Sequence, residues 1–357
     1  MIIAELDSPA LAEAGGIWQG MSGSPVYADD GRLIGAVSYG LSYGPSPIAG
    51  LTPFEEMDEY MATASRPARV DGRTARAIAK ASDVSAAQAS RGFEPLGVPT
   101  GVSGVGPARL AKLTQHKRAY FPKSAFAAGR VSAAAATADD VVAGGNLAAS
   151  YSYGDITSGG VGTATSICDD RVVGFGHPMD FLGETTMSLH PADALYVQPD
   201  SLGAPFKVAN FGPPAGTISE DHLTGITGTF GPTPAGALVT SDLSFNGRSR
   251  VGSSVVTVRD AWPSVTFYQQ IANHDRVVDA IRKGSESQSW VVQGSQGGKP
   301  FTFRHSDRYT SSYDISYDAS YELADLVYLL SSVDGVDVDT IDVDTVDAAE
   351  ELSLIHI

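Results

Sequence analysis

The sequence contains a single cysteine, Cys168, among its 357 residues. One thiol cannot form an internal disulfide or a metal site made of several cysteines, so both are excluded. We expect Cys168 to be a small buried apolar residue, which is the commoner role of a lone cysteine than that of a reactive thiol. Nothing else in the sequence implies a metal or an organic cofactor, and we expect none.

Basic residues and long apolar runs are also scarce. Lys and Arg total 24 against 41 for Asp and Glu, which gives a net charge of -17. A strongly acidic chain is repelled by phosphate backbones and anionic lipid surfaces, so we expect no nucleic-acid partner. There is no run of about twenty apolar residues, so we expect no transmembrane segment. The sequence leaves the oligomeric state open.

The residues that are present indicate a multidomain protein that is mainly β with some α. Hydrophobic residues make up 43% of the chain, enough for two or three cores. No signal peptide is visible, Met1 to Leu6 has the pattern of the middle of a strand, and Leu352 to Ile357 is expected to be non-native read-through. We therefore interpret the chain as a fragment.

Turn residues and periodicity predict four regions before that tail. Short strands punctuated by Gly, Pro and Asp are expected in residues 1–66 as the carboxy-terminal part of a β-barrel, closed by a helix over 53–65. Residues 67–143 form a helical, low-complexity connector, with helices near 73–91 and 107–117. Residues 144–258 form a second β unit.

Residues 259–351 are expected to form an α+β region. A helix is predicted over 267–283, strands over 290–317 and a second helix over 321–331. Residues 336–344 alternate apolar with acidic side chains, which predicts an exposed strand.

The densest chemical signal is the hexapeptide from Gly20 to Pro25, Gly-Met-Ser-Gly-Ser-Pro. A serine hydroxyl attacks a carbonyl when it projects from a tight turn whose amides face the developing oxyanion, and glycines permit that backbone path. We predict Ser22 as the nucleophile, with the amides of Gly20 and Ser22 as the oxyanion hole. Ser24 is expected to satisfy the turn with its hydroxyl. The alternative is an ordinary Gly/Ser turn.

The residues after the hexapeptide resemble the nucleophile barrel of chymotrypsin-like peptidases. A hairpin at Asp29-Asp30-Gly31 leads to the strand 33–40 and then to residues 47–53 before a helix. In that fold, the backbone of the strand after the serine pairs with the substrate. The resemblance therefore assigns Ser38, Tyr39 and Gly40 to substrate binding.

The segments Gly15 to Pro25 and Gly31 to Val37 resemble the stage IV sporulation protein B peptidases and their actinobacterial relatives. This resemblance implies a catalytic aspartate fifteen residues before the serine, where Asp7 stands, and a histidine in a Gly-His turn after a glycine-rich strand, where His177 stands. In that family, the histidine precedes the serine, whereas here it follows. Catalytic triads occur in several chain orders, so the reversal does not forbid catalysis.

Other assignments stay open at this point. His177 has the alternative of a hydrogen-bonded turn residue, with His190 and His222 as weaker candidates for the base. Asp7 has the alternative of capping a helix over residues 9–14. Four acidic residues near His177 in sequence also qualify as the group that orients it: Asp155, Asp169, Asp170 and Asp180.

Two functional hypotheses follow. The first is a serine endopeptidase or self-processing protein, acting on a polypeptide or on itself, with Ser22 as nucleophile, His177 as base and Asp7 as orienting group. The second is a non-catalytic secreted or envelope β scaffold that retains the peptidase fold. The resemblance places either one outside the cytoplasm.

Overall fold

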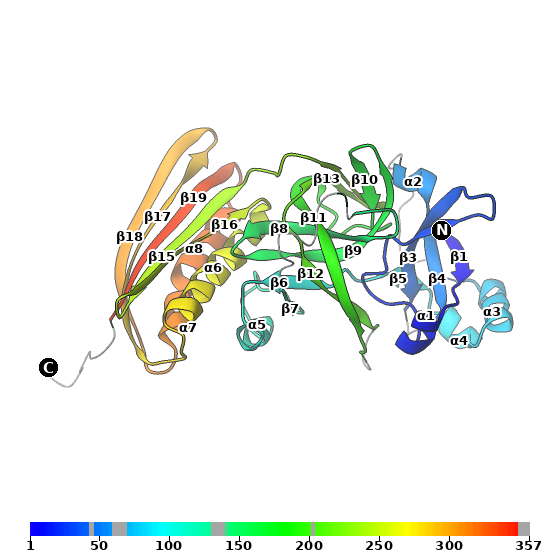
Figure 1. The fold of residues 1–357 in the computed structure, drawn as a ribbon, viewed down its shortest axis with the longest axis horizontal. Coiled ribbons are helices and arrows are strands. Elements are labelled where there is room, and N and C mark those ends of the chain that lie inside the picture. Colours follow the sequence, from blue (N-terminus) through cyan, green and yellow to red (C-terminus); the bar gives the residue numbers. More distant parts are fainter. Residues whose placement is uncertain (43–45, 59–69, 130–138, 140, 201–203, 349–357) are drawn as a thin grey trace. The chain divides into compact units, whose positions relative to one another are not determined.

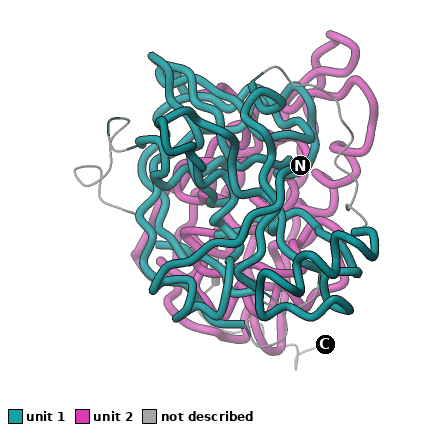
Figure 2. The backbone as a smooth tube through the Cα atoms, turned by 90° about the vertical axis from the view of Figure 1, so that its right-hand side faces the viewer, with its two compact units in different colours: residues 1–101, 128–150, 159–233 teal, residues 102–127, 151–158, 234–357 magenta. Residues whose placement is uncertain are grey.

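The computed structural model describes residues 1–42, 46–58, 70–129, 139, 141–200 and 204–348. The predicted read-through at 352–357 and the second half of the predicted helix at 53–65 lie outside these residues. The chain divides into two compact units (Figure 2). Unit 1 contains residues 1–101, 128–150 and 159–233, and unit 2 contains the remainder.

The nucleophile segment folds as an open antiparallel sheet in unit 1. Its strands run in the order β1-β4-β3-β2, and β5 pairs with the second half of β3. The predicted Asp-Asp-Gly hairpin joins β2 to β3, with Gly31 at a φ of 83°. The bounds of the strands are β1 Ile2–Glu5, β2 Pro25–Tyr27, β3 Leu33–Leu41, β4 Ile48–Pro53 and β5 Phe93–Pro95.

The second β unit closes into a six-stranded antiparallel barrel. Hydrogen-bonded neighbours follow the order β8-β11-β13-β14-β10-β9, and β9 pairs back with β8 (Figure 1, green strands). Closure leaves none of these strands with a fully unpaired edge. The bounds are β8 Asn146–Gly154, β9 Thr157–Cys168, β10 Arg171–Gly174, β11 Gly183–Gln198, β13 Gly216–His222 and β14 Gly225–Phe230, and β12 Phe206–Phe211 pairs with β11.

Short helices and strands occupy the predicted connector and the edges of the first sheet. The helix predicted at Pro9 begins there, with the Ser8 hydroxyl accepting a hydrogen bond from the Leu11 amide. The bounds are α1 Pro9–Ala14, α2 Phe54–Asp58, α3 Gly72–Ala81, α4 Ala86–Ala89, β6 Thr100–Ser103, α5 Pro107–Thr114 and β7 Phe126–Ala128.

Unit 2 is a twisted sheet with helices packed on it. Its strands run β18-β17-β19-β15-β16, α6 lies against β15 and β16, and α8 packs on α6 (Figure 1). The bounds are β15 Ala237–Phe245, β16 Arg248–Val256, η2 Arg259–Ala261, α6 Trp262–Val277, β17 Gly284–Gln296, β18 Lys299–Ser311, α7 Ile315–Ala319, α8 Tyr321–Ser331 and β19 Val336–Ala348. The fold class predicted from the sequence, mainly β with some α, is confirmed.

Two expectations were wrong. The strand β19 is not solvated: it lies between β17 and β15, and Val336, Val338, Ile341 and Val343 are buried while the acidic residues between them face outward. Apolar and polar side chains alternate in any strand with one solvent-exposed face, whether the strand lies in the middle of a sheet or at its edge. The pattern therefore could not distinguish these two positions. Cys168 is exposed, because it ends β9 at a two-residue turn.

Candidate active site

Ser22 lies in the predicted turn, after the isolated β-bridge residue Gln19 and before β2 begins at Pro25. The Ser24 amide and hydroxyl both donate to the Met21 carbonyl, at 3.0 and 2.7 Å, which closes the turn as expected for Ser24. Gly20 and Gly23 have φ of 85° and 95°, a region that side chains with a Cβ avoid. The glycines of the hexapeptide are therefore required by its backbone.

The serine turn packs against the barrel. The Thr163 amide of β9 donates to the Ser22 carbonyl at 2.9 Å, and the Thr165 hydroxyl donates to the Gly23 carbonyl at 2.7 Å. A Cβ on Gly23 would lie 2.0 Å from the Thr163 carbonyl oxygen and 2.6 Å from the Phe175 amide nitrogen. The first sheet and the barrel thus meet at Ser22, through backbone contacts that only glycine allows.

The amides around Ser22 divide into two kinds. Those of Met21 and Gly23 donate to the carbonyls of Trp18 and Val37. Those of Gly20 and Ser22 have no acceptor among the described residues. Two unpaired amides beside a buried hydroxyl are the donors that an oxyanion hole requires.

His177 follows β10 in a strained turn. Phe175 and Gly176 have φ of 67° and 70°, and the Gly176 carbonyl accepts a hydrogen bond from the Thr52 hydroxyl of β4 at 2.6 Å. A Cβ on Gly176 would also lie 2.0 Å from the Ser38 hydroxyl of β3. The same sheet that carries Ser22 therefore supports the histidine turn.

The protonation of His177 follows from its contacts. Its Nδ1 lies 2.7 Å from the Pro178 carbonyl oxygen, which can only accept, so the ring proton sits on Nδ1 and Nε2 carries the lone pair. Burial lowers the pKa of His177 to about 4, against smaller opposing effects of the Pro178 hydrogen bond and the Asp221 charge. At neutral pH the ring is uncharged and its Nε2 is available as a base.

The Ser22 hydroxyl and His177 Nε2 are both buried and have no hydrogen-bond partner among the described residues. They therefore do not bond to each other in this structure. Unsatisfied buried polar atoms are uncommon, since each costs roughly 1–3 kcal/mol. The described residues include other buried polar atoms without a partner, among them Trp18 Nε1 and Ser188 Oγ, so this state by itself assigns no reaction.

Asp221, which the sequence reasoning missed, holds the loop that follows His177. Its carboxylate is fully buried and accepts the amides of Met179, Asp180 and Leu182 at 2.8, 2.9 and 3.2 Å. It is also the acidic group whose charge acts on His177. Asp221 lies 44 residues after the histidine in β13, so no local spacing pointed to it.

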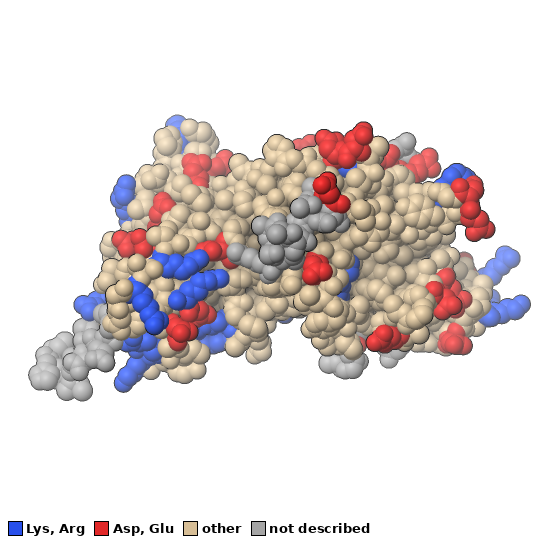
Figure 3. Space-filling model, in the orientation of Figure 1, with Lys and Arg blue, Asp and Glu red and all other residues tan. Residues whose placement is uncertain are grey.

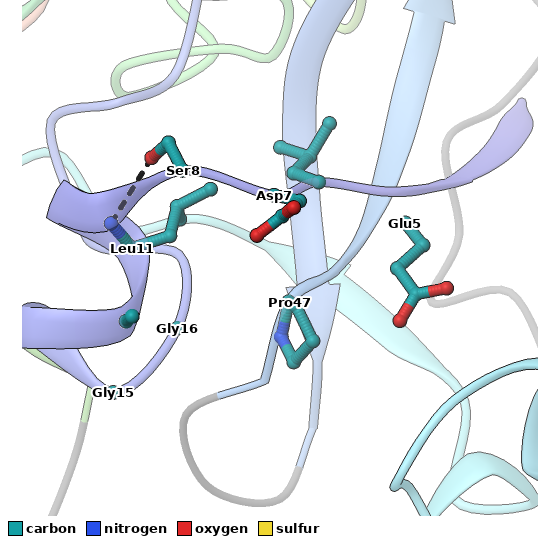
Figure 4. A pocket seen from close by; sticks show the side chains of 9 residues that line it. Glu5, Asp7, Ser8, Leu11, Gly15, Gly16 and Pro47 are labelled. Carbon is teal, nitrogen blue, oxygen red and sulfur yellow. Dashed lines mark hydrogen bonds between the residues drawn. The ribbon is translucent and has the colours of Figure 1, made fainter.

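Asp7 does not reach this site by any contact among the described residues. It is exposed in a pocket beside α1, where Ser8 caps the helix (Figure 4). The ring of His177 bonds the Pro178 carbonyl and not Asp7. Of the other acidic candidates, Asp155 pairs with Arg250, and the Asp180 amide donates to Asp221.

His190 and His222 have partners of their own. In the barrel interior, the Ser150 hydroxyl bonds His190 Nε2 at 2.7 Å, and His190 Nδ1 bonds the Gly212 carbonyl at 2.9 Å. Both side chains are at most 1% exposed, and the pair joins β8 to β11. His222 Nε2 bonds Glu220 at 2.7 Å.

Lys207 is a second residue that the sequence reasoning missed. Its ammonium is buried beside the serine turn and bonds Asn146 Oδ1, the Gly162 carbonyl and Thr163 Oγ1 at 2.9, 3.1 and 3.3 Å. Burial lowers the pKa of Lys207 to about 8. Three acceptors for three ammonium protons indicate a structural cation, which holds β9 where it contacts Ser22.

The strand assigned to substrate binding is already paired. Tyr39 and Gly40 of β3 pair with Pro95 and Glu94 of β5 in antiparallel register. The Leu96 amide extends this ladder by donating to the Ser38 carbonyl at 2.9 Å. A cavity of about 200 Å³ remains beside this ladder, lined by Ile17, Gln19, Gly40, Leu41, Ser46, Glu94, Pro95, Leu96, Gly97 and Ala204.

In the part of the chain that the structure describes, one group of three side chains has metal-ligand geometry. The ligand atoms of His305, Asp307 and Glu322 lie within 4.8 Å of one another at the surface of unit 2. Exposed acidic groups often lie this close without an ion, so the group assigns no metal. On the face in Figure 3, acidic and basic side chains are both present and most of the surface is uncharged.

Comparison with known proteins identifies one segment. Residues 1–50 match the family model described as SpoIVB peptidase S55. The match includes Asp7 and Ser22 and supports the resemblance stated from the sequence, while His177 lies outside it. The match is a likeness of this segment, and the six-stranded barrel is compatible with a chymotrypsin-like fold.

No curated protein and no solved structure matches the chain. Among the described residues, no helix is long and apolar enough to cross a membrane.

Proposed function

We propose that this protein is a serine endopeptidase in which Ser22 attacks the substrate carbonyl and His177 acts as general base and acid. Nε2 of His177 takes the proton of the Ser22 hydroxyl and returns it to the leaving amine. The amides of Gly20 and Ser22 stabilise the oxyanion, each contributing roughly 3 kcal/mol. The substrate is a polypeptide, this chain included.

The observation that carries this proposal is the serine turn, where the Ser22 hydroxyl lies beside two amides without acceptors among the described residues. The sheet that follows this turn also holds the turn of His177, through the bond from the Thr52 hydroxyl to the Gly176 carbonyl. The Pro178 carbonyl holds the imidazole tautomer that a general base needs. In a triad, this orienting position belongs to a carboxylate. Asp7, the aspartate that the family resemblance implies, stays a prediction for that role.

A fluorophosphonate probe tests the nucleophile. It should label the full chain at Ser22, and Ser22→Ala should abolish labelling and peptide hydrolysis, because the hydroxyl is the reacting atom. His177→Ala should lower the rate of hydrolysis about as much, and Asp7→Ala should lower it less. Ser24→Ala is the matched control: it removes a hydroxyl two residues away and should leave Ser22 labelled. A folded chain that is never labelled would contradict the proposal.

The non-catalytic scaffold is the second candidate, and one observation favours it. Ser22 Oγ and His177 Nε2 are buried and not bonded to each other, so the pair would have to adjust before catalysis. In a scaffold, Ser22→Ala and the parent would behave identically on a peptide library. Activity that depends on Ser22 decides against it.

We also propose an extracytoplasmic location, supported by the family match at residues 1–50. Fusion of the full coding sequence to a reporter that is active only after export tests it. A reporter that stays inactive while the fusion is produced would contradict this location.

A further inference from the structure

The segment from Phe93 to Pro99 runs along the proposed site in the manner of a bound peptide. Its first part is the short strand β5, which pairs antiparallel with the second half of β3, Tyr39 to Leu41. Addition of an extended peptide to a strand edge is a general mode of peptide recognition, in which the backbone supplies affinity and alternate side chains supply specificity. Here the added strand belongs to the same chain.

Leu96 is the residue anchored most firmly. Its amide donates to the Ser38 carbonyl at 2.9 Å, and its side chain is only 6% exposed. The side chain belongs to a hydrophobic cluster with Ile17, and its Cδ2 would lie 3.2 Å from a Cβ on Gly40. Leu96 therefore fills an apolar pocket directly beside the serine turn.

Past Leu96, the segment crosses the serine turn toward the barrel. A Cβ on Gly97 would lie 2.9 Å from the Gln19 side chain, and a Cβ on Gly20 would lie 3.4 Å from Pro99 Cδ. The Pro99 carbonyl then accepts a hydrogen bond from the Val161 amide of β9 at 3.4 Å. The segment thus passes from the strand beside Ser22, over the residues that frame the oxyanion amides, to the barrel that carries His177.

We propose that Phe93 to Pro99 is a tethered occupant of the peptide-binding path, with Leu96 in the specificity pocket. The Leu96 carbonyl accepts no hydrogen bond from the Gly20 or Ser22 amide, so the Leu96–Gly97 bond is not held for cleavage. This inference rests on the proposed peptidase function and names its substrate class. The site takes extended polypeptides with an aliphatic residue before the cleaved bond. A peptide from another molecule binds only when the segment has left β3.

Release of the segment is tested by the rate at which a fluorophosphonate probe labels Ser22 in the full chain. Leu96→Ala removes the anchor and should speed labelling by roughly tenfold or more, since loss of a buried leucine side chain shifts such equilibria by at least a decade. Leu11→Ala is the matched control, because Leu11 is also 6% exposed and lies in the same cluster but outside the segment. It should leave the labelling rate unchanged.

A second variant avoids the hydrophobic core. Glu94 is exposed and pairs with Gly40, so Glu94→Pro removes a backbone donor from β5 without removing a buried side chain. It should speed labelling as Leu96→Ala does. If the folded parent, Leu96→Ala and Glu94→Pro all label Ser22 at one rate, the tethered occupant is wrong while the peptidase stands. If all are folded and none is labelled, the peptidase fails and this inference with it.

The specificity is tested on the released variant Glu94→Pro with peptide anilides Phe-Glu-Pro-X, where X is Leu, Asp or Lys. Hydrolysis after Leu should exceed that after Asp or Lys by at least tenfold, because a charge in the apolar pocket is desolvated without a partner. Equal hydrolysis of the three peptides would overturn the placement of Leu96.

Discussion

Asp221 gives the sharpest prediction at the level of single residues. Its carboxylate accepts three backbone amides and donates nothing, so the amide group of Asp221→Asn would place an NH₂ against N–H donors. We expect a loss of roughly 2–3 kcal/mol in the free energy of unfolding, measured with urea. If the loop positions His177, kcat should also fall by at least tenfold at unchanged KM.

Asp170→Asn is the control for that substitution, because Asp170 is exposed and contributes its backbone carbonyl, which accepts the Phe230 amide and which the change retains. It should leave both stability and kcat near those of the parent. A fall in stability without any change in kcat for Asp221→Asn would restrict Asp221 to a structural role.

If His177 is the general base, its pKa predicts that activity tolerates acid. With a pKa of about 4, lowered by burial, the ring stays neutral and basic at every pH well above that value. The logarithm of kcat/KM should be flat from neutral pH to about 5 and fall only below it. An inflection near 6.5 would mean that the ring is solvated in the working enzyme. Circular dichroism at each pH must accompany the rates to confirm that the chain is folded.

At the level of elements, the contact between the serine turn and β9 depends on Gly23. A Cβ at this position would meet backbone atoms of Thr163 and Phe175, which cannot move alone. Gly23→Ala should therefore displace the turn, abolish labelling of Ser22, and destabilise the chain by several kcal/mol, on the scale of severe overpacking.

Gly31→Ala separates this clash from backbone strain. Gly31 also has a positive φ, 83° against 95° for Gly23, but a Cβ there has nothing within 4 Å. Gly31→Ala should lower the free energy of unfolding by about 1 kcal/mol, the usual cost of a left-handed backbone conformation for a residue with a Cβ. It should leave labelling of Ser22 intact. Equal effects of the two substitutions would show that contact with the barrel is unimportant.

For the whole molecule, two buried histidines predict how stability depends on pH. Burial lowers the pKa of both His177 and His190 to about 4, below the value near 6.5 that they have in an unfolded chain. The unfolded state therefore binds protons first as the pH falls. The stabilisation is complete above pH 6.5 and is lost as the pH falls toward 4, by about 2 kcal/mol per histidine at pH 5.

Hydrogen exchange of the barrel strands at pH 7 and pH 5 measures this loss within unit 1. His190→Gln should remove about half of the pH dependence of the exchange free energy, since it deletes one of the two groups. Exchange free energies that are equal at the two pH values would contradict the neutral, buried state of both rings.

The sequence by itself determined the features that depend on neighbours along the chain. The turn at Ser22, the hairpin at Asp29–Gly31 and the helices at Pro9 and Tyr321 follow from glycine, capping residues and apolar spacing within a few residues. The match of residues 1–50 to a peptidase family rests on the same local pattern.

Only the tertiary structure decided what surrounds Ser22. It brings the turn of His177 onto the sheet of Ser22, places Asp221 beneath that turn, and lays residues 93–96 along β3. Each of these contacts joins residues more than forty positions apart, where spacing along the chain carries no information about distance. Asp and Lys are rarely buried, so nothing in the sequence marks Asp221 or Lys207 as an interior residue. Their roles are visible only in the structure, where backbone amides bind the Asp221 carboxylate and oxygen acceptors bind the Lys207 ammonium.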